Sequence, residues 1–502
     1  MDAAGCSPRG CEKRVPVRAK NSRIGSASPG WGSTGVLVDC GLASFGVCSI
    51  NAPAATDGYV LTTPDGHPYP SSASLRIALL GYRSAPFSGG QGIYLHYLSQ
   101  ALQRLGHQVT VISGPPYPHL DEGVELQKLP SLDLYAHGLK SVTFRQLLRD
   151  PLARAEWFSK LTGGFIEPWT FGERAKAWLL AHADHFDVIH DNQTLSDGIL
   201  ALQEAGLPLV TTIHHPITKD RRLALAAEPV WYRRLLVRRW HDFLTMQGRV
   251  AQQLRHVVTV SGVSRADIIA DFGVHPACID VAYNGVDAEL FKPLPGVERK
   301  PAQVMATASA DTPNKGLQVL LRAAAALRDR GVVIQLLLVS RPRPGGDTEK
   351  LVASLRLAEQ IRWVSGVDHA TLVALYAEST LAVVPSLYEG FGLPAVEAMA
   401  CGMPLIVTDG GALPEVAGDA ATVVPAGDAE ALADAIASLL DDEERRQVLS
   451  ERARDRALRE FCWTVCAQRL VACYHRAIAD SPQVQSSPAT PVTGFDPEVP
   501  GC

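Results

Sequence analysis

The sequence of 502 residues lacks several features that would assign it to a class at once. It has no run of roughly 18 apolar residues, so we expect no membrane-spanning helix. Its formal net charge is −5, which argues against a general nucleic-acid-binding protein, because such proteins carry a basic surface. No Asp-x-Asp triad stands out, so we expect neither an essential metal nor a cofactor.

The cysteines also lack the arrangement of a metal site. Ten are scattered along the chain, and Cys462 and Cys466, four positions apart, have no companion cluster of histidine or cysteine. We interpret them as reduced, mostly buried thiols of a cytoplasmic protein. What is present is a composition of 46% hydrophobic and 20% charged residues, which is typical of a globular protein with a substantial core.

The two ends of the chain differ in composition from the body. Residues 1–74 are rich in glycine, serine, proline and alanine and have no sustained period, with a basic start and an apolar run at 35–50. We interpret them as a disordered extension or as the product of a start codon placed too far upstream; a targeting peptide is the alternative. Residues 481–502 are rich in proline and serine and are expected to form a flexible tail.

The body predicts a first α/β domain over residues 75–285. Residues 75–81 (LRIALLG) form an apolar run of buried-strand type, and a glycine loop, an amphipathic helix and a second strand at 109–113 follow. Such a strand–loop–helix–strand unit opens a parallel sheet. Further strands of this domain are predicted at 187–190, 208–213 and 256–261.

A second alternating series predicts another domain of the same kind over residues 286–461. Its helices are predicted at 317–328 and 429–440, and a last helix within 462–480 is expected to pack back toward the first domain. Two successive series of this type indicate two doubly wound domains, whose ligands bind at the carboxyl ends of strands. The strands are predicted at 303–309, 332–340, 361–364, 381–385, 404–408 and 421–424.

The segment 385–398 (PSLYEGFGLPAVEA) carries the strongest chemical signal. An apolar strand ends at its start, Glu389 lies in a glycine-containing turn, and Glu397 is predicted in the first turn of a helix opened by Pro394. Two carboxylates at a strand's carboxyl end suit sugar hydroxyls, since each accepts several hydrogen bonds. Nearby amides at a helix start favour negative charge; they belong to Gly390, Phe391 and Gly392. The alternative is that Glu397 only stabilises its own helix start and Glu389 is solvated.

This segment resembles the signature of the retaining glycosyltransferases of family GT4, in which seven residues also separate the two glutamates. The resemblance spans roughly residues 75–478. It implies the GT-B fold, that is, two facing Rossmann-like α/β domains with the donor site in the interdomain cleft. It also implies that Glu389 contacts the transferred sugar and Glu397 the ribose of a nucleotide-sugar donor.

Other residues resemble family features at the expected places. Gly89 and Gly90 resemble the loop that lets donor phosphates approach the backbone. Lys315 resembles the lysine that neutralises the donor diphosphate. Gly410 and Gly411, followed by Glu415, resemble a later glycine loop that faces the sugar and phosphates. The alternative is that the first glycine loop is an ordinary βα turn and that Lys315 is a surface lysine.

One departure concerns the diphosphate site. The family usually carries an arginine a few residues before the lysine, whereas this chain has no arginine there and Ser309 stands at the corresponding place. A hydroxyl binds phosphate without neutralising it. Either Arg341 or Arg343, after the next strand, substitutes, or donor binding and leaving-group stabilisation are weaker.

Histidines end two strands of the first domain. His214 directly follows the strand at 208–213, and the resemblance puts it near the transferred sugar and the acceptor; His215 is the second choice. His190, at the end of another strand, is predicted to line the acceptor pocket. Without the resemblance, a histidine at a strand end is more often structural.

Residues 219–255 hold nine Lys or Arg against three Asp or Glu, with large apolar residues between them. One interpretation is a basic amphipathic surface in peripheral contact with anionic lipid at the inner face of the membrane, which would suit a lipid acceptor. The other is an amphipathic helix packed on the sheet with a solvated basic face.

These observations predict transfer of a hexose from a nucleoside-diphosphate sugar to an acceptor hydroxyl of a lipid, glycan or small molecule, with retention. Two alternatives remain: a nucleotide-sugar epimerase, and a non-catalytic nucleotide-sugar-binding partner. A nicotinamide dehydrogenase is disfavoured because the loop at 89–92 is not G-x-G-x-x-G. The donor base, the sugar and the acceptor stay open.

Overall fold

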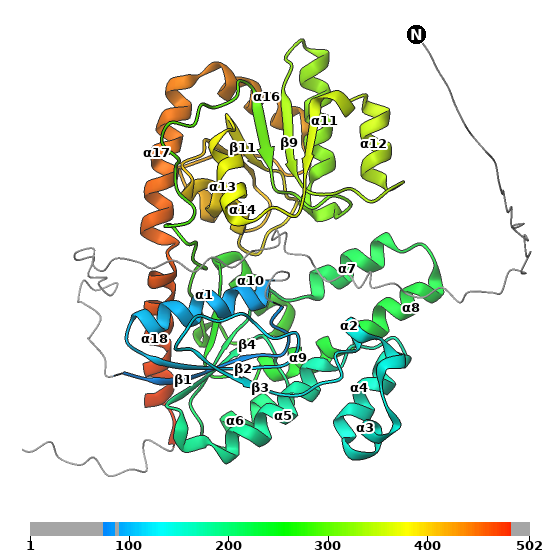
Figure 1. The fold of residues 1–502 in the computed structure, drawn as a ribbon, viewed down its shortest axis with the longest axis vertical. Coiled ribbons are helices and arrows are strands. Elements are labelled where there is room, and N and C mark those ends of the chain that lie inside the picture. Colours follow the sequence, from blue (N-terminus) through cyan, green and yellow to red (C-terminus); the bar gives the residue numbers. More distant parts are fainter. Residues whose placement is uncertain (1–73, 86–89, 483–502) are drawn as a thin grey trace, which may run out of the picture. The chain divides into compact units, whose positions relative to one another are not determined.

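The computed structural model describes residues 74–85 and 90–482 (Figure 1). The predictions for the N-terminal extension, for Gly89 and for the tail beyond residue 482 lie outside these residues. All described elements belong to one compact unit and build two parallel sheets. No described helix combines the length and apolar character that crossing a membrane requires.

The first sheet has seven parallel strands in the order β3-β2-β1-β4-β5-β6-β7, the order of a doubly wound fold with one added strand. Register pairs Ile77 with Val109 and with Val188, so β1 lies between β2 and β4. The strands are β1 (Arg76–Gly81), β2 (Gln108–Ser113), β3 (Glu125–Lys128), β4 (Val188–Asn192), β5 (Leu209–Thr212), β6 (Val257–Thr259) and β7 (Ile279–Val281).

Ten described helices precede residue 286, and those that pack on this sheet lie on both of its faces. Ile77 and Leu79 of β1 point to one face, while Ala78 and Leu80 point to the other, as the period of two requires. The helices are α1 (Gly90–Arg104), α2 (Leu134–His137), α3 (Phe144–Arg149), α4 (Pro151–Leu161), α5 (Glu167–Ala181), α6 (Asp197–Glu204), α7 (Thr218–Ala227), α8 (Trp231–Trp240), α9 (Phe243–Ala251) and α10 (Gly262–Phe272). Short 3₁₀ turns follow α2, α5 and α10; they are η1 (Leu139–Ser141), η2 (Ala183–His185) and η3 (Pro276–Cys278).

The second sheet repeats the same order with six strands, β10-β9-β8-β11-β12-β13. Its first strand β8 therefore lies beside the fourth, β11, and the chain winds outward in both directions from this pair. The strands are β8 (Gln303–Ala306), β9 (Gln335–Val339), β10 (Ile361–Val364), β11 (Leu381–Val384), β12 (Leu405–Thr408) and β13 (Thr422–Val424).

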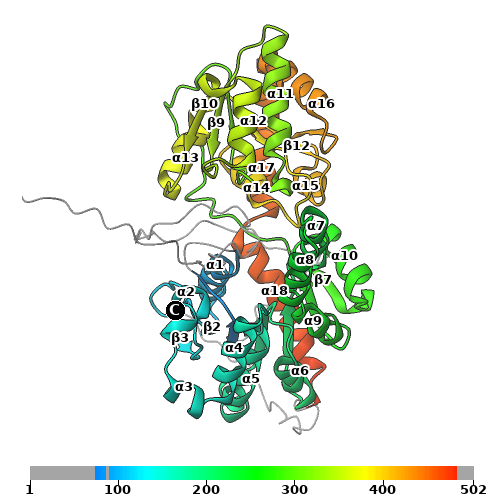
Figure 2. The ribbon, with the colours of Figure 1, turned by 90° about the vertical axis from the view of Figure 1, so that its right-hand side faces the viewer.

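Helices cover both faces of the second sheet. Leu336 and Leu338 pack in the cluster formed by α11, α12 and α16, whereas Leu337 packs with α13, α14, α15 and α17. In Figure 2, α11 and α12 lie side by side over the first of these faces. The helices are α11 (Leu317–Asp329), α12 (Asp347–Leu355), α13 (His369–Ala377), α14 (Leu393–Ala400), α15 (Leu413–Ala417), α16 (Ala429–Asp441) and α17 (Glu443–Glu460), with turns η4 (Pro313–Lys315) and η5 (Ala358–Gln360).

The last helix, α18 (Trp463–Ala479), completes the first sheet rather than the second. Its residues Cys466, Leu470 and Tyr474 are buried in the same cluster as Ile77 of β1, and α18 packs along α1 on this face (Figure 1). An isolated bridge between Val286 and Cys462 joins the segment that opens the second series to the start of α18.

Several elements differ from the sequence-based expectation. The strands β3 and β7 were not predicted, because each is short and β3 is half exposed and polar. The segment 219–255 forms three separate helices rather than one. Helix α14 begins at Leu393 with Gly392 as its N-cap, so Glu397 opens the second turn and not the first.

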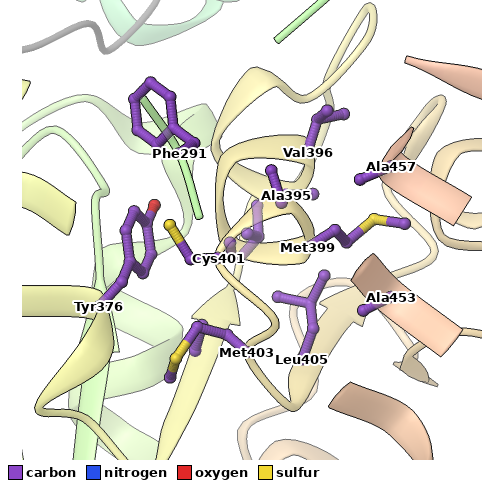
Figure 3. Packing of buried hydrophobic residues seen from close by; sticks show 14 of the residues in the cluster. Phe291, Tyr376, Ala395, Val396, Met399, Cys401, Met403, Leu405, Ala453 and Ala457 are labelled. Atoms are coloured by element: carbon purple, nitrogen blue, oxygen red, sulfur yellow. The ribbon is translucent and has the colours of Figure 1, made fainter. Parts of the chain in front are cut away.

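Figure 3 shows the core beneath α14, where Met399 and Leu405 face Ala453 and Ala457 of α17. Leu405 is fully buried, whereas Leu458 on the outer side of α17 is 44% exposed. We therefore expect Leu405→Ala to lower the free energy of unfolding by roughly 2–5 kcal/mol, since it leaves a cavity in a packed core. Leu458→Ala is the matched control and should change it by less than about 0.5 kcal/mol. Urea denaturation measures both, and equal effects would contradict this account of the core.

Candidate active site

The loops that follow β8 and β11 meet at the carboxyl edge of the second sheet. Because these neighbouring strands lead to opposite sides of the sheet, their loops flank a crevice, which is the usual ligand site of a doubly wound fold. A small hollow lies there in the structure. It is lined by Thr307, Ala308, Lys315, Val383, Val384, Pro385, Ser386, Glu389 and Pro394.

An ion pair between Lys315 and Glu389 lies at this hollow. Lys315 Nζ donates to Glu389 Oε1 at 2.9 Å and to Oε2 at 3.1 Å, and Ser386 Oγ donates to Oε1 at 2.7 Å. The two side chains are only 9% and 11% exposed. The structure thus joins two residues that the sequence assigned separately, one to the donor diphosphate and one to the sugar.

Gly316 explains why these two loops come so close. Its φ is +66°, and a Cβ built there would lie 1.8 Å from the carbonyl oxygen of Pro385. No residue other than glycine tolerates such a contact. A hydrogen bond from Leu387 N to Asn314 O at 2.7 Å joins the two loops. This contact places Lys315 next to Glu389.

Glu397 is buried on α14, and its surroundings raise the pKa of its carboxyl to about 8. The cause is desolvation, with no compensating partner, and within residues 74–85 and 90–482 no hydrogen bond or ion pair reaches the carboxyl. A buried carboxyl of this kind is costly unless a ligand completes its hydrogen bonds.

The remaining predicted residues of the second sheet lie around this pair. Glu389 and Gly411 form an isolated parallel bridge, and Glu389 N donates to Gly410 O at 3.3 Å, so the two glycine loops lie side by side. Gly392 caps α14. The Phe391 ring is buried in the core against Tyr283, so only the backbone of this residue is available to a ligand.

The loop after β8 also contains Ser309, which is partly exposed. Two residues later, Asp311 binds the loop after β9: Arg343 N donates to Asp311 Oδ2 at 2.8 Å, and Arg343 Nε lies 3.7 Å from the same oxygen. The side chain of Arg343 is 68% exposed. Arg343 therefore lies beside the segment in which the expected arginine is missing.

His214 follows β5 at the carboxyl edge of the first sheet. Asn192 Nδ2 donates to Gln91 O at 3.4 Å, which leaves Asn192 Oδ1 to accept from His214 Nε2 at 2.8 Å. The Tyr94 ring packs edge to face against the imidazole of His214, with ring centres 4.8 Å apart. Burial, and then the neighbouring His215, lower the pKa of His214 to about 3, so the ring is neutral with Nδ1 as its acceptor nitrogen.

His190 occupies a different environment from the one predicted. Its Nδ1 is 2.6 Å from the hydroxyl of Tyr474 on α18, and its Nε2 is 2.7 Å from Thr212 Oγ1. The side chain is 1% exposed, and burial lowers its pKa to about 3. Both ring nitrogens are engaged inside the fold, so contact with an acceptor would require one of these bonds to break.

Gly90 begins α1, and a Cβ there would meet open space, whereas a Cβ at Gly92 would lie 2.2 Å from Ala85 O. Gly92 is thus the glycine that this loop requires, and sequence reasoning did not single it out.

The sequence also did not predict the contacts between the loop that contains Gly390 and α10. Ser261 Oγ and Ser264 Oγ donate to Gly390 O at 2.6 and 3.0 Å. Glu415, expected near the ligand, instead accepts from Gly262 N at 2.8 Å and from the Tyr283 hydroxyl at 2.9 Å, and so caps α10. Serines at a helix start give no signal of such distant partners. No group of three or more His, Cys, Asp or Glu among the described residues is arranged to hold a metal ion.

Known proteins match both halves of the chain. Residues 295–456 match the family model described as Glycosyl transferases group 1, and residues 88–290 match the one described as Glycosyltransferase Family 4. The MMP alpha-(1→4)-mannosyltransferase of Mycolicibacterium hassiacum is 45% identical over 414 residues, which cover 81% of this chain and 99% of that protein. The phosphatidyl-myo-inositol mannosyltransferase of Mycolicibacterium smegmatis is 30% identical, with 83% of this chain and 97% of that protein covered.

Solved structures share the fold. Sucrose-phosphate synthase from Thermosynechococcus elongatus has a TM-score of 0.61 at 24% identity, covering 81% of this chain and all of that one. Anabaena Alr3699/HepE in complex with UDP and glucose has a TM-score of 0.56 at 18% identity, covering 79% and 98%. Two doubly wound α/β domains of this kind form the GT-B fold. The chain belongs to glycosyltransferase family 4, and the epimerase and non-catalytic alternatives receive no support from these relatives.

The unpartnered carboxyl of Glu397 predicts a pH dependence of stability. Its pKa is raised from 4.5 to about 8 in the folded state, so between these values only the unfolded chain loses this proton. Stability therefore falls as pH rises through this window, by up to about 1.4 kcal/mol per pH unit, and the fall ends above about pH 8. Glu397→Gln stays neutral and should have a flatter profile between pH 5 and 8 in urea denaturation.

Glu444→Gln, at an exposed position of α17, is the control and should keep the wild-type slope. Parallel stability profiles for the wild type and Glu397→Gln would mean that the carboxyl is compensated in the fold.

Proposed function

We propose that the enzyme transfers a mannosyl group from a nucleoside-diphosphate sugar to a hydroxyl of a saccharide acceptor, with retention of the anomeric configuration. The observation that carries the proposal is the Lys315–Glu389 pair at the carboxyl edge of the second sheet. The sugar and the 1→4 linkage are suggested by the name of the relative with 45% identity, since a 1→4 linkage is made to a sugar ring.

In this proposal the donor diphosphate takes Lys315 as its counter-ion. Glu389, released from the ammonium group but still bonded to Ser386, then accepts hydrogen bonds from the sugar hydroxyls. The buried carboxyl of Glu397 accepts from the ribose, which would satisfy a group that has no hydrogen-bond partner among the residues that the structure describes. Arg343 supplies a second positive charge beside Ser309, in place of the arginine that the family usually has nearby.

The proposed reaction occurs on one face of the sugar. The bond from the anomeric carbon to the diphosphate oxygen breaks while the acceptor oxygen bonds to the same face, and the acceptor proton passes to the departing phosphate oxygen. Lys315 and the amides of Gly390 and Gly411 stabilise the negative charge that builds on the phosphate. His214, held by Asn192, accepts a sugar hydroxyl at Nδ1 and so orients the ring.

A direct test follows the release of nucleoside diphosphate from UDP-linked and GDP-linked hexoses, with and without a manno-oligosaccharide. We expect release from one donor, and only with acceptor present, with an α-linked product identified by NMR. Glu389→Gln should lower kcat/KM by roughly a hundredfold or more, because it removes a charged contact to the reacting sugar. Glu444→Gln, with its side chain exposed on α17, should match the wild type.

Two results would overturn the proposal. Conversion of the donor sugar to an epimer without acceptor would identify an epimerase, and tight donor binding with no turnover for any acceptor would identify a binding protein.

A basic surface around α8 supports a second, separate proposal, that the enzyme contacts anionic lipid at the cytoplasmic leaflet. No side chain of α8 is buried, and Trp231, Tyr232 and Leu235 are 72%, 50% and 50% exposed. Apolar rings beside several arginines are the features of an interfacial helix. The arginines of α8 are Arg233, Arg234, Arg238 and Arg239.

Sedimentation with vesicles tests this contact. The wild type should bind vesicles that contain phosphatidylserine and not vesicles of phosphatidylcholine alone, and added salt should weaken the binding. The double variant Trp231→Ser with Leu235→Ser should partition at least about tenfold less, because it removes the apolar anchors. Leu458→Ser on α17 is the matched control; equal partition of both variants would exclude α8 as the contact.

A further inference from the structure

A second hollow, of about 450 Å³, lies at the opposite edge of the first sheet, at the amino ends of β1 and β2. Nothing in the proposed reaction uses it. It is lined by Arg76, Ile77, Gln108, Thr110, Glu125, Leu126, Gln127, Trp178, His185 and Phe186.

The floor of this hollow is a polar stretch of sheet. Ile77, Val109 and Val111 face α1 and α18, so the alternate residues Gln108 and Thr110 face the opposite side, toward α5. Register pairs Thr110 with Glu125 and Ile112 with Gln127, which brings both β3 side chains to the same face. The part of this face that lines the hollow carries the amides of Gln108 and Gln127 and the hydroxyl of Thr110, which donates to the carboxylate of Glu125 at 3.2 Å.

The wall of the hollow is aromatic and rigid. Trp178, near the end of α5, stacks on His182 with ring centres 4.1 Å apart, and His182 Nδ1 lies 2.7 Å from Trp178 O. Phe186 lies beside the same indole, with ring centres 6.0 Å apart. Rings fixed in this way offer apolar contact area with little further loss of entropy on binding.

The charge of the hollow disfavours an anionic ligand. Arg76 carries a positive charge at the hollow. Its Nη2 binds Asp187 Oδ1 at 2.7 Å, and its Nη1 donates to Asp184 O at 2.7 Å. Glu125 adds a negative charge. A phosphate would therefore gain little from Arg76, whose charge is already paired with Asp187. A neutral polyhydroxylated ligand can instead form hydrogen bonds with the amides and the carboxylate and pack against the aromatic rings.

We propose that this hollow is a second carbohydrate site, which holds a distal part of the saccharide acceptor. The inference rests on the proposed function, because it takes the acceptor to be a sugar chain. The six residues of β1, at about 3.3 Å each, separate the hollow from the carboxyl edge by roughly 17 Å. Only a long acceptor reaches both places, so the site favours long chains over short ones.

The test compares the wild type with the double variant Gln108→Ala and Gln127→Ala. Both side chains lie at the sheet surface, outside the buried core, so the fold should be preserved; a thermal melt checks this. We expect KM for a long manno-oligosaccharide to rise roughly tenfold through the loss of hydrogen bonds, while KM for mannobiose and kcat stay unchanged. Gln447→Ala, exposed on α17, is the matched control.

Calorimetry with the long oligosaccharide, in the absence of donor, separates this inference from the proposed function. Weaker binding by the double variant supports the hollow even if no donor is turned over. The inference would be overturned if the double variant matched the wild type in its affinity for the long oligosaccharide and in its KM for each chain length. In that case, turnover of the short acceptor would still support the transferase proposal.

Discussion

The close approach of Gly316 to the carbonyl of Pro385 is the contact on which the candidate active site depends. It exists because β8 and β11 are neighbours in the sheet, although their first residues, Gln303 and Leu381, are 78 positions apart in the chain. The loops after these strands can then touch, and a residue with a side chain at position 316 would keep them apart. Since Lys315 precedes this contact and Glu389 follows Pro385 by four residues, backbone geometry alone brings the two charges together.

The resulting ion pair is poorly exposed, and such pairs contribute little to stability, because desolvation offsets their attraction. Its value is better understood as preorganisation. The hydrogen bonds between the two groups, and the one from Ser386 to Glu389, fix the positions of both side chains before any ligand arrives. In the proposed reaction, the donor diphosphate would replace Glu389 as the anion beside Lys315. Glu397 differs, because no hydrogen bond or ion pair from the described residues compensates its carboxyl, and burial raises its pKa.

Much of the fold could be predicted from alternation and glycine placement. The apolar strands β1, β8 and β11 were found within a few residues of their observed bounds, since buried parallel strands are continuous apolar runs. The short strand β3 was missed because its residues are polar and half exposed at a sheet edge. Sequence reasoning also named Lys315 and Glu389 separately, but no local pattern reveals that their side chains bond to each other.

His190 shows why the remaining site assignments could not be read from local sequence. Its position at the end of a strand is the same as that of His214, yet its Nδ1 lies against Tyr474, 284 residues later in the chain. That partner exists only because α18 returns to cover the face of the first sheet that holds Ile77 and Leu470. The same return places Trp463 against Tyr94, whose ring also contacts His214. The last helix, which the sequence predicted to pack back toward the first domain, is therefore part of the environment that keeps both histidines neutral, although no local pattern reveals these particular contacts.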